Sequence, residues 1–316
     1  MKIVVLDGHT LNPGDLSWDK LNQLGDVIIY DRTEPGCVLE RARSADIVLV
    51  NKTVLNREII EKLHNLKYIG ILATGYNVVD LDAAEEKNII VTNVPNYSSN
   101  SVAQLVFAFI LEFCNHVGEH GNSTKNGEWF NSKDFCYWKY PIMELNGKNI
   151  GIIGYGNIGK KVALLAEAYG MNIMIYSKSK VENPNLNQVT LQELLTKSDF
   201  ITIHCPLNQE TRGLINVDSL GMMKSSAYLI NTSRGPIINE KDLAFALDAH
   251  SIAGAGLDVI SIEPPKENNA LFLAKNCIIT PHIGWASKES RGRLLDIAME
   301  NIKGFIDGKF QNVIHR

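Results

Sequence analysis

Short apolar, β-branched runs alternate with helical patterns along almost the whole of this 316-residue chain. Five such runs occur in the first hundred residues, at 2–7, 26–31, 46–51, 67–73 and 88–93. Six more follow, at 149–154, 172–177, 200–205, 227–232, 254–259 and 277–282. The segments between them carry apolar residues at helical spacing. This alternation predicts an α/β fold built of doubly wound parallel sheets, with helices on both faces of each sheet.

A glycine-rich turn starts the second series of strands, so we expect two domains, in keeping with the length of the chain. We expect residues 1–98 and 288–316 to form one domain and residues 99–287, inserted between them, to form the other. Two long helices are predicted to connect the domains, at 99–118 and 287–306. A small ligand is expected to bind in the cleft between the two domains.

Composition and charge argue against several classes of function. The net charge is −4 and no basic run occurs, so we expect no nucleic-acid partner. The longest apolar stretch, 102–114, is interrupted by Gln104 and Glu112 and is too short to span a bilayer, so we expect no membrane association. The N-terminal residues lack the pattern of a signal peptide. The five widely spaced cysteines include no C-x-x-C pair, which predicts reduced thiols in a cytoplasmic protein without a metal site.

The turn GYGNIG, residues 154–159, follows an apolar strand and opens a helical pattern. Gly154 allows the tight turn, Gly156 lets the backbone approach a pyrophosphate, and Gly159 lets the helix pack close to the strand. The N-terminus of the following helix offers N–H groups and a partial positive charge to phosphates. The turn therefore predicts a dinucleotide site.

Polar side chains follow three later strands, where the carboxyl ends of parallel strands meet and ligands bind. Residues 232–234 (Thr-Ser-Arg) follow one strand, Asp258 ends another with Glu263 close behind, and His282 follows a third. Taken singly, Arg234 could be a surface ion-pair residue, Glu263 a solvated turn acid and His282 a structural residue. Their joint placement predicts that they converge on one site.

These motifs resemble those of the D-isomer-specific 2-hydroxyacid dehydrogenase family. The likeness rests on GYGNIG, NTSRG, GLDV with the following EPP, and PHIGW, and extends to ATGYNVVDLDAA (73–84) and VPNYSSNSVAQ (94–104). It covers essentially the whole chain and is greatest to the family's glycerate dehydrogenase (hydroxypyruvate reductase) branch. The resemblance implies a Rossmann-type nucleotide domain inserted into a flavodoxin-like substrate domain.

The resemblance also implies catalytic roles for Arg234, Glu263 and His282. His282 would give a proton to the substrate carbonyl oxygen as hydride arrives at the carbon. Glu263 would hold the tautomer of the imidazole and raise its pKa. Arg234 would bind the α-carboxylate and polarise the carbonyl. Asp258 would orient the nicotinamide carboxamide.

Further residues are carried over from the family as binding residues. Those expected to contact the cofactor are Gly154, Tyr155, Gly156, Asn157, Ile158, Gly159, Ser177, Lys178, Cys205, Pro206, Thr232, Ser233, Arg234, Asp258, His282 and Gly284. Those expected to contact the substrate are Asn51, Ala73, Thr74, Gly75, Arg234 and His282. In this reading Cys205 packs beside the adenosine and is not a nucleophile.

The strand that ends at Tyr176 carries no acid where a ribose-binding Asp or Glu is usual, about twenty residues beyond the glycine turn. Ser177 stands at that position and Lys178 follows it. A serine removes the repulsion that a carboxylate exerts on a 2′-phosphate, which predicts that NADP is accepted or preferred. Alternatively, Lys178 is an ordinary solvated charge and NAD is bound less selectively.

We therefore expect a reductase that interconverts a small 2-oxo acid and its D-2-hydroxy acid, with hydroxypyruvate/D-glycerate first and glyoxylate second. The alternatives are a D-lactate-, phosphoglycerate- or formate-type dehydrogenase and a non-catalytic, NAD(H)-sensing binding protein. Family members are typically dimers, so a homodimer is expected. An aromatic-rich loop at 129–141 is either part of that interface or packed on its own domain.

Overall fold

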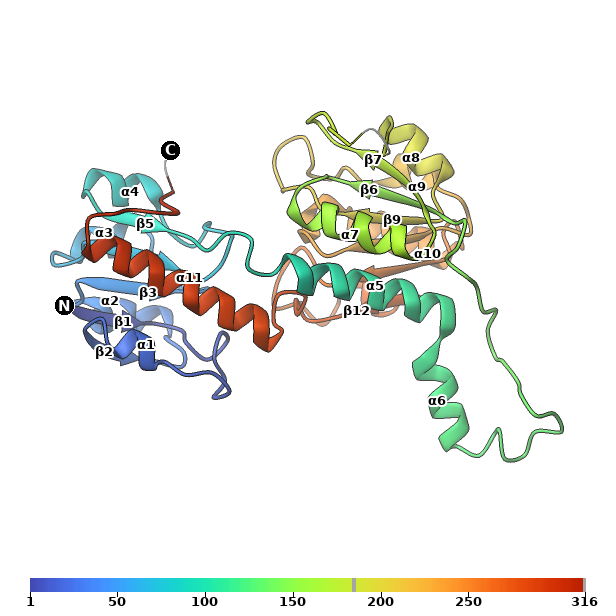
Figure 1. The fold of residues 1–316 in the computed structure, drawn as a ribbon, viewed down its shortest axis with the longest axis horizontal. Coiled ribbons are helices and arrows are strands. Elements are labelled where there is room, and N and C mark those ends of the chain that lie inside the picture. Colours follow the sequence, from blue (N-terminus) through green and yellow to red (C-terminus); the bar gives the residue numbers. More distant parts are fainter. Residues whose placement is uncertain (184–185, 315–316) are drawn as a thin grey trace. The chain divides into compact units, whose positions relative to one another are not determined.

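The computed structural model describes residues 1–183 and 186–314. The chain divides into two compact units: Met1–Ser98 with Trp285–Arg316, here called unit one, and Ser99–Gly284, here called unit two. Each unit is built on one parallel sheet with helices on both faces (Figure 1). The α/β fold of two doubly wound parallel sheets is thereby confirmed. The assignment of a substrate role to unit one and a cofactor role to unit two stays a prediction.

The sheet of unit one has five parallel strands in the order β2-β1-β3-β4-β5, which is the flavodoxin-like order. The strands are β1 Lys2–Val5, β2 Asp26–Ile29, β3 Ile47–Val50, β4 Tyr68–Ile71 and β5 Ile90–Thr92. β3 and β4 are buried along their whole length, as expected of strands covered on both faces.

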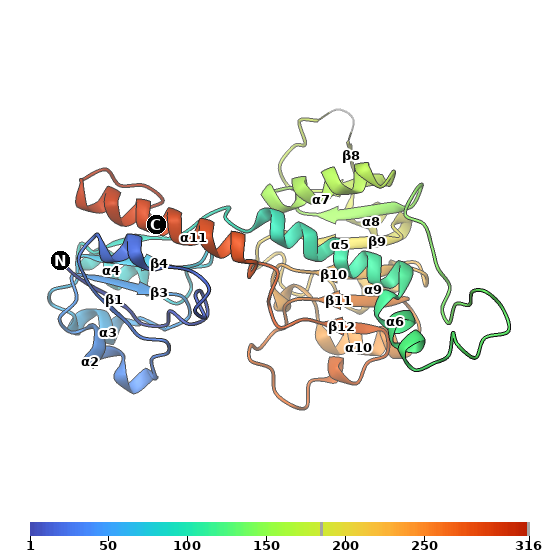
Figure 2. The same ribbon diagram turned by 60° about the horizontal axis from the view of Figure 1, so that its bottom comes forward.

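Alternate residues of these strands enter two separate cores of unit one. Val4, Val48 and Ile69 pack beneath α2, α3 and α4, whereas Ile3 and Ile47 pack beneath α1 and α11. Figure 2 shows α11 lying along its face of this sheet. The helical elements are α1 Asp19–Asn22, η1 Pro35–Cys37 (a 3₁₀ turn), α2 Val38–Ala42, α3 Arg57–Lys62, α4 Leu81–Glu86 and α11 Lys288–Ile306.

The sheet of unit two has seven parallel strands in the order β12-β11-β10-β9-β6-β7-β8. Read from β8, this is the Rossmann order 3-2-1-4-5-6 with a seventh strand added. Successive strands are added on one side of β6 as far as β8 and on its other side from β9 onward. The boundary between β6 and β9 is therefore the switch point at which such sheets bind ligands. The strands are β6 Asn149–Ile153, β7 Asn172–Tyr176, β8 Asn187–Gln188, β9 Phe200–Ile203, β10 Tyr228–Asn231, β11 Gly254–Leu257 and β12 Cys277–Ile279.

Helices cover both faces of the second sheet as well. α5 and α7 bury Ile150 and Ile152 on one face, and α8, α9 and α10 bury Ile201 and Ile203 on the other. α5 approaches β11 so closely that a Cβ on Gly256 would lie 2.7 Å from the ring of Phe109. The helical elements are α5 Ser99–Asn115, α6 Val117–Lys125, α7 Asn157–Ala168, α8 Leu191–Lys197, α9 Val217–Met222, η2 Gly235–Ile237, α10 Glu240–Asp248 and η3 Ala270–Phe272.

The structure differs from the sequence-based elements in two places. The long helix predicted near 99–118 is broken at His116, whose backbone is left-handed (φ 48°), and resumes as α6. Gly118 lies two residues beyond, but a single glycine near the end of an apolar helical pattern does not fix where the helix breaks. The two-residue edge strand β8 is polar and was not predicted, because it lacks the apolar alternation by which strands are recognised.

Within the described part of the chain, no single helix is long and apolar enough to cross a membrane. α5 and α6 reach the required length and composition only as a pair, with a bend of 55° between them.

Candidate active site

The glycine turn between β6 and α7 is shaped by two close backbone contacts. Gly154 is left-handed (φ +94°), and a Cβ there would lie 2.6 Å from the backbone nitrogen of Cys205. A Cβ on Gly159 would lie 2.3 Å from the carbonyl oxygen of Gly154. Both positions therefore require glycine, as the sequence motif predicts.

Gly156 differs from its neighbours, because a Cβ there would meet no described atom within 4 Å. Gly156 is also the N-cap residue of α7 and has no side chain to cap it, whereas Asn56, Thr190 and Asn239 cap the N-termini of α3, α8 and α10 with their side chains. Open space beside an uncapped helix N-terminus suits a pyrophosphate. The turn therefore fits a dinucleotide cofactor.

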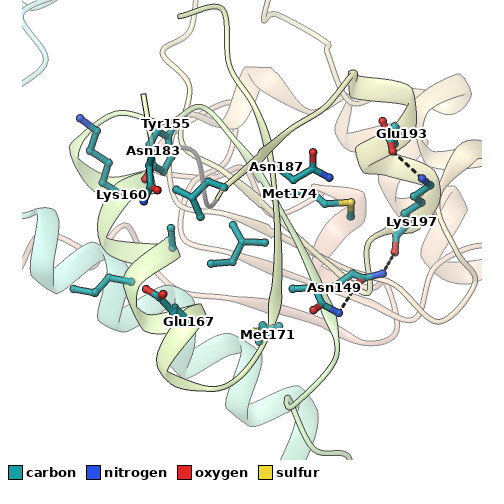
Figure 3. Close-up of a pocket in the computed structure, with 15 residues that line it drawn as sticks. Asn149, Tyr155, Lys160, Glu167, Met171, Met174, Asn183, Asn187, Glu193 and Lys197 are labelled. Carbon is teal, nitrogen blue, oxygen red and sulfur yellow. Dashed lines mark hydrogen bonds and ion pairs between the residues drawn. The ribbon is translucent and has the colours of Figure 1, made fainter. Parts of the chain in front are cut away.

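Two side chains of the turn, those of Tyr155 and Ile158, pack against other parts of unit two. Ile158 packs against the core beneath α5 and α7. Tyr155 lines a cavity of about 620 Å³ together with residues of α7 and β7 and with Asn183, Leu186 and Asn187. Lys160 Nζ lies 5.9 Å from the centre of the Tyr155 ring. Figure 3 shows Tyr155, Lys160 and Asn183 together at one end of this cavity. Any contact of Tyr155 with a cofactor is thus assigned to its backbone.

The loop after β9 lies directly against the glycine turn and is fixed by two hydroxyl groups. Ser233 Oγ donates a hydrogen bond to the carbonyl oxygen of Cys205 (2.6 Å), and Thr211 Oγ1 donates one to that of Pro206 (2.6 Å). Burial raises the pKa of the Cys205 thiol, so the thiol stays protonated at neutral pH. This fits the predicted packing role of Cys205.

Two buried polar groups at this sheet edge have no hydrogen-bond partner among the described residues: Thr232 Oγ1 and the imidazole of His204. Burial lowers the pKa of His204 to about 3, which keeps the ring neutral. Buried polar groups are normally hydrogen-bonded, so Thr232 Oγ1 and the two ring nitrogens of His204 support the presence of a bound group there. Thr232 was predicted to bind the cofactor, whereas His204, immediately before Cys205, was not identified from the sequence.

Asp258, at the end of β11, holds the segment that carries His282. Its side chain is 2% exposed and accepts hydrogen bonds from Thr280 Oγ1 (2.6 Å) and from the backbone nitrogens of Ile283 (2.8 Å) and Gly284 (2.8 Å). Three bonds to one buried carboxylate fix the backbone on both sides of His282. This positioning role adds to the predicted contact with the nicotinamide.

His282, which follows β12, and Glu263, which follows β11, form a hydrogen-bonded pair. His282 Nδ1 lies 2.6 Å from Glu263 Oε2, and Glu263 Oε1 accepts a bond from the backbone nitrogen of Ile260 (3.1 Å). The side chains are 30% and 36% exposed, so both remain in reach of solvent. A carboxylate at Nδ1 selects the tautomer with a proton there and leaves Nε2 for proton exchange with a ligand.

Arg234 follows β10, the strand next to β11, and is exposed. Its Nη1 donates to the carbonyl oxygen of Ser233 (2.7 Å). The buried Asn231 holds this turn, because its Nδ2 donates to the Arg234 carbonyl oxygen (3.0 Å) and its Oδ1 accepts from the Ser233 nitrogen (3.0 Å). A Cβ on Gly235 would lie 2.0 Å from the carbonyl carbon of Ile260, so the turn packs against the segment leading to Glu263.

Arg234, Glu263 and His282 thus stand at the carboxyl ends of three neighbouring strands, β10, β11 and β12, as predicted. Asn231 was not identified from the sequence, where it is one polar residue at the end of an apolar strand.

In unit one, Asn51 is buried and joins neighbouring strands: its backbone nitrogen donates to Asp7 Oδ1 (2.7 Å) and its Nδ2 to the Leu72 carbonyl oxygen (2.9 Å). The turn Ala73-Thr74-Gly75 is held by Thr74, whose Oγ1 donates to the carbonyl oxygen of Val94 (2.9 Å). The contact of these residues with substrate stays a prediction.

Ser177 and Lys178 follow β7, as expected, and Lys178 forms an ion pair with Glu210 in the loop after β9. Nothing in the sequence links these two residues, which are far apart in the chain.

In residues 1–183 and 186–314, no group of three or more His, Cys, Asp or Glu side chains is arranged to hold a metal ion.

Comparison with known proteins agrees with this architecture. The model of the D-isomer specific 2-hydroxyacid dehydrogenase NAD binding domain matches residues 107–284. A hydroxypyruvate reductase of Blautia hydrogenotrophica is 50% identical over 100% of both chains, and a glycerate dehydrogenase of Methylorubrum extorquens is 39% identical over 99% of this chain and 98% of its own.

Among solved structures, an acyclic imino acid reductase in complex with NADPH and D-Arg superimposes with a TM-score of 0.87. It is 33% identical and covers 100% of both chains. The range matched by the family model spans the glycine turn and the strand ends that carry Arg234, Glu263 and His282.

Proposed function

This chain belongs to the D-isomer-specific 2-hydroxyacid dehydrogenase family, and on that premise we propose that it reduces hydroxypyruvate to D-glycerate, with glyoxylate as a second substrate. It is an oxidoreductase that uses a nicotinamide cofactor on 2-hydroxy and 2-oxo acids. The choice of hydroxypyruvate rests on the relative that is 50% identical over the full length. The observation that carries the chemistry is the 2.6 Å contact between His282 Nδ1 and Glu263 Oε2.

Reduction of a 2-oxo acid needs one hydride at the carbonyl carbon and one proton at its oxygen. The nicotinamide cofactor supplies the hydride when bound. His282 Nε2 gives the proton to the carbonyl oxygen and takes it back in the reverse reaction. Glu263 holds Nδ1–H and stabilises the charged ring by hydrogen bonding and opposite charge.

Arg234 binds the substrate carboxylate, for which its planar guanidinium is suited, and polarises the neighbouring carbonyl. Its exposed guanidinium and its turn, held by Asn231, support this role. The backbone amides of the Ala73-Thr74-Gly75 turn in unit one are a second proposed contact for the carboxylate.

The glycine turn and the loop after β9 would hold the cofactor, with Thr232 and Asp258 as further proposed contacts. NADPH is accepted as well as NADH, because Ser177 leaves the end of β7 without the acid that disfavours a 2′-phosphate. The cation of Lys178 supports the same proposal.

The protein acts as a homodimer in the cytoplasm. Residues 129–141 carry aromatic side chains exposed to 93% (Phe130), 90% (Phe135) and 66% (Trp138), a surface typical of a protein interface. All five cysteines are free thiols, as in reducing compartments.

A substrate panel tests the function. Hydroxypyruvate, glyoxylate, pyruvate and 3-phosphohydroxypyruvate are each mixed with the protein and either NADH or NADPH, and the loss of reduced-nicotinamide absorbance is followed. We expect the highest kcat/KM with hydroxypyruvate and D-glycerate as the product. A preference for pyruvate or the phosphorylated acid would identify a D-lactate- or phosphoglycerate-type enzyme. Tight cofactor binding without turnover of any acid would identify a nucleotide-sensing protein.

A further inference from the structure

Two loops of unit two meet across the glycine turn. In the sheet, β6 lies between β7 and β9. The loop after β7 carries Lys178, and the loop after β9 carries Glu210. Lys178 Nζ and the Glu210 carboxylate form an ion pair. This pair therefore joins the loops on either side of the turn at which the dinucleotide is proposed to bind.

The loop of Lys178 is held by one side chain of the edge strand. Gln188 Nε2 donates hydrogen bonds to the carbonyl oxygens of Ser177 (2.8 Å) and Ser179 (3.2 Å), and its Oε1 accepts one from the backbone nitrogen of Val181 (3.0 Å). The backbone around Ser177 is thus fixed, while the side chain of Lys178 is 67% exposed and can change partner.

The loop of Glu210 is held in a similar way. Asn208 Oδ1 accepts hydrogen bonds from the backbone nitrogens of Glu210 (3.0 Å) and Thr211 (3.0 Å), and Thr211 Oγ1 ties the loop to the Pro206 carbonyl oxygen. The Glu210 side chain is 65% exposed. A fixed backbone therefore directs a solvated carboxylate toward the end of β7.

We propose that Glu210 is a residue that sets the selectivity of this protein between NADH and NADPH. The end of β7 normally supplies the carboxylate that meets the adenosine ribose, and here it supplies Ser177. Glu210 brings a carboxylate to the same edge from the neighbouring loop and occupies Lys178, the cation next to Ser177. This inference rests on the proposed cofactor site and refines its specificity.

The charges explain why Glu210 acts on one nucleotide and not the other. A 2′-phosphate is attracted by Lys178 and repelled by Glu210, whereas a 2′-hydroxyl is affected little by either charge. The exposed pair between Lys178 and Glu210 is weak, so a phosphate can displace Glu210 from Lys178. Binding of NADPH then breaks the ion pair between Lys178 and Glu210 and places the 2′-phosphate near the Glu210 carboxylate. Both effects weaken NADPH binding, and both are removed when Glu210 is replaced by a neutral residue.

The test is the equilibrium binding of adenosine 2′,5′-bisphosphate and of adenosine 5′-monophosphate, measured by calorimetry on the full-length protein. These probes differ only in the 2′-phosphate and require no turnover. In Glu210→Gln we expect the Kd of the bisphosphate to fall about tenfold, equivalent to about 1.4 kcal/mol, with the Kd of the monophosphate unchanged. In Lys178→Met we expect the Kd of the bisphosphate to rise instead.

Glu193→Gln is the matched control, because it removes a similar exposed ion pair of the same unit. Glu193 Oε1 lies 2.7 Å from Lys197 Nζ within α8. Figure 3 marks this ion pair with a dashed line. Both Kd values are expected to match those of the unmodified protein. The effect at Glu210 is expected to shrink at high salt, because the charges are exposed.

The inference would be overturned if Glu210→Gln bound the two probes with the same ratio of Kd values as the unmodified protein, whether neither Kd changed or both changed by the same factor. The proposed function is judged separately. A protein that shows the expected ratio but reduces no 2-oxo acid would refute the proposed reaction and leave the role of Glu210 standing.

Discussion

Replacing Glu263 by glutamine tests how much the reaction depends on the group that holds the catalytic histidine. Glu263 accepts from His282 Nδ1 at 2.6 Å and from the Ile260 nitrogen at 3.1 Å. Glutamine has nearly the same shape but no charge, and its amide can present N–H to the ring and select the other tautomer. The protonated imidazole would then lose its charged partner while the backbone stays in place.

The size of the effect follows from the contact and its exposure. A hydrogen bond to a charged group contributes about 1.5–3 kcal/mol. Solvent reaches 36% of the Glu263 side chain, which places the loss toward the lower end of that range. Since about 1.4 kcal/mol corresponds to a factor of ten in rate, we expect kcat for hydroxypyruvate to fall about tenfold to thirtyfold.

The assay is steady-state kcat at saturating hydroxypyruvate and cofactor, together with the Kd of the cofactor and the Tm. Glu267→Gln is the control, because Glu267 is an exposed acid of the same loop and its replacement is expected to leave kcat unchanged. An unchanged kcat in Glu263→Gln would refute the proposed role. A loss of kcat accompanied by an equal loss of cofactor binding would also refute it, because the contact would then serve binding rather than proton transfer.

Four further substitutions test the supporting structure. Gly156→Ala is expected to raise the Kd of the cofactor, because the new Cβ would enter the open space that suits the pyrophosphate, and to change Tm little, because it would meet no described atom. Gly154→Ala is expected to lower Tm, since a left-handed backbone alone costs a residue with a Cβ about 1–2 kcal/mol. Asp258→Asn, which sets an amide against buried N–H donors, is expected to lower kcat and cost about 2–4 kcal/mol of stability, seen as a lower Tm. The hydrogen bond from Arg291 lowers the pKa of Asp15, so this carboxylate stabilises the fold above its ordinary pKa and the contribution disappears as pH falls through the lowered value. Asp15→Asn is therefore expected to lower Tm at neutral pH and to flatten the decline of Tm below about pH 4.

The fold and the three proposed catalytic residues could be anticipated because they follow local rules. Strand–helix alternation predicts parallel sheets, and the carboxyl ends of parallel strands lie at one edge. Arg234, Glu263 and His282 each stand just beyond an apolar run, so their neighbourhood follows once the strands are adjacent. The glycine turn carries its own steric requirements, which the structure reproduces at Gly154 and Gly159.

The supporting residues could not be anticipated, because their partners are set by tertiary contacts. Asn231 looks like one polar residue at a strand end, yet it holds the turn of Arg234 from a buried position. Glu210 lies far along the chain from Lys178, and only the order of β7, β6 and β9 brings the two loops together. The helix breaks at the left-handed His116, two residues before Gly118, and the exact position of such a break is not set by residue type.

The most direct test of the account is a single-turnover measurement with His282→Ala. The variant is saturated with NADPH or NADH, mixed with hydroxypyruvate, and followed by the absorbance of the reduced nicotinamide, with cofactor Kd measured in parallel. We expect an unchanged Kd and a loss of the reduction rate of about a hundredfold or more, the range of general acid catalysis. A rate equal to that of the unmodified protein would contradict the assignment of His282 as the proton donor.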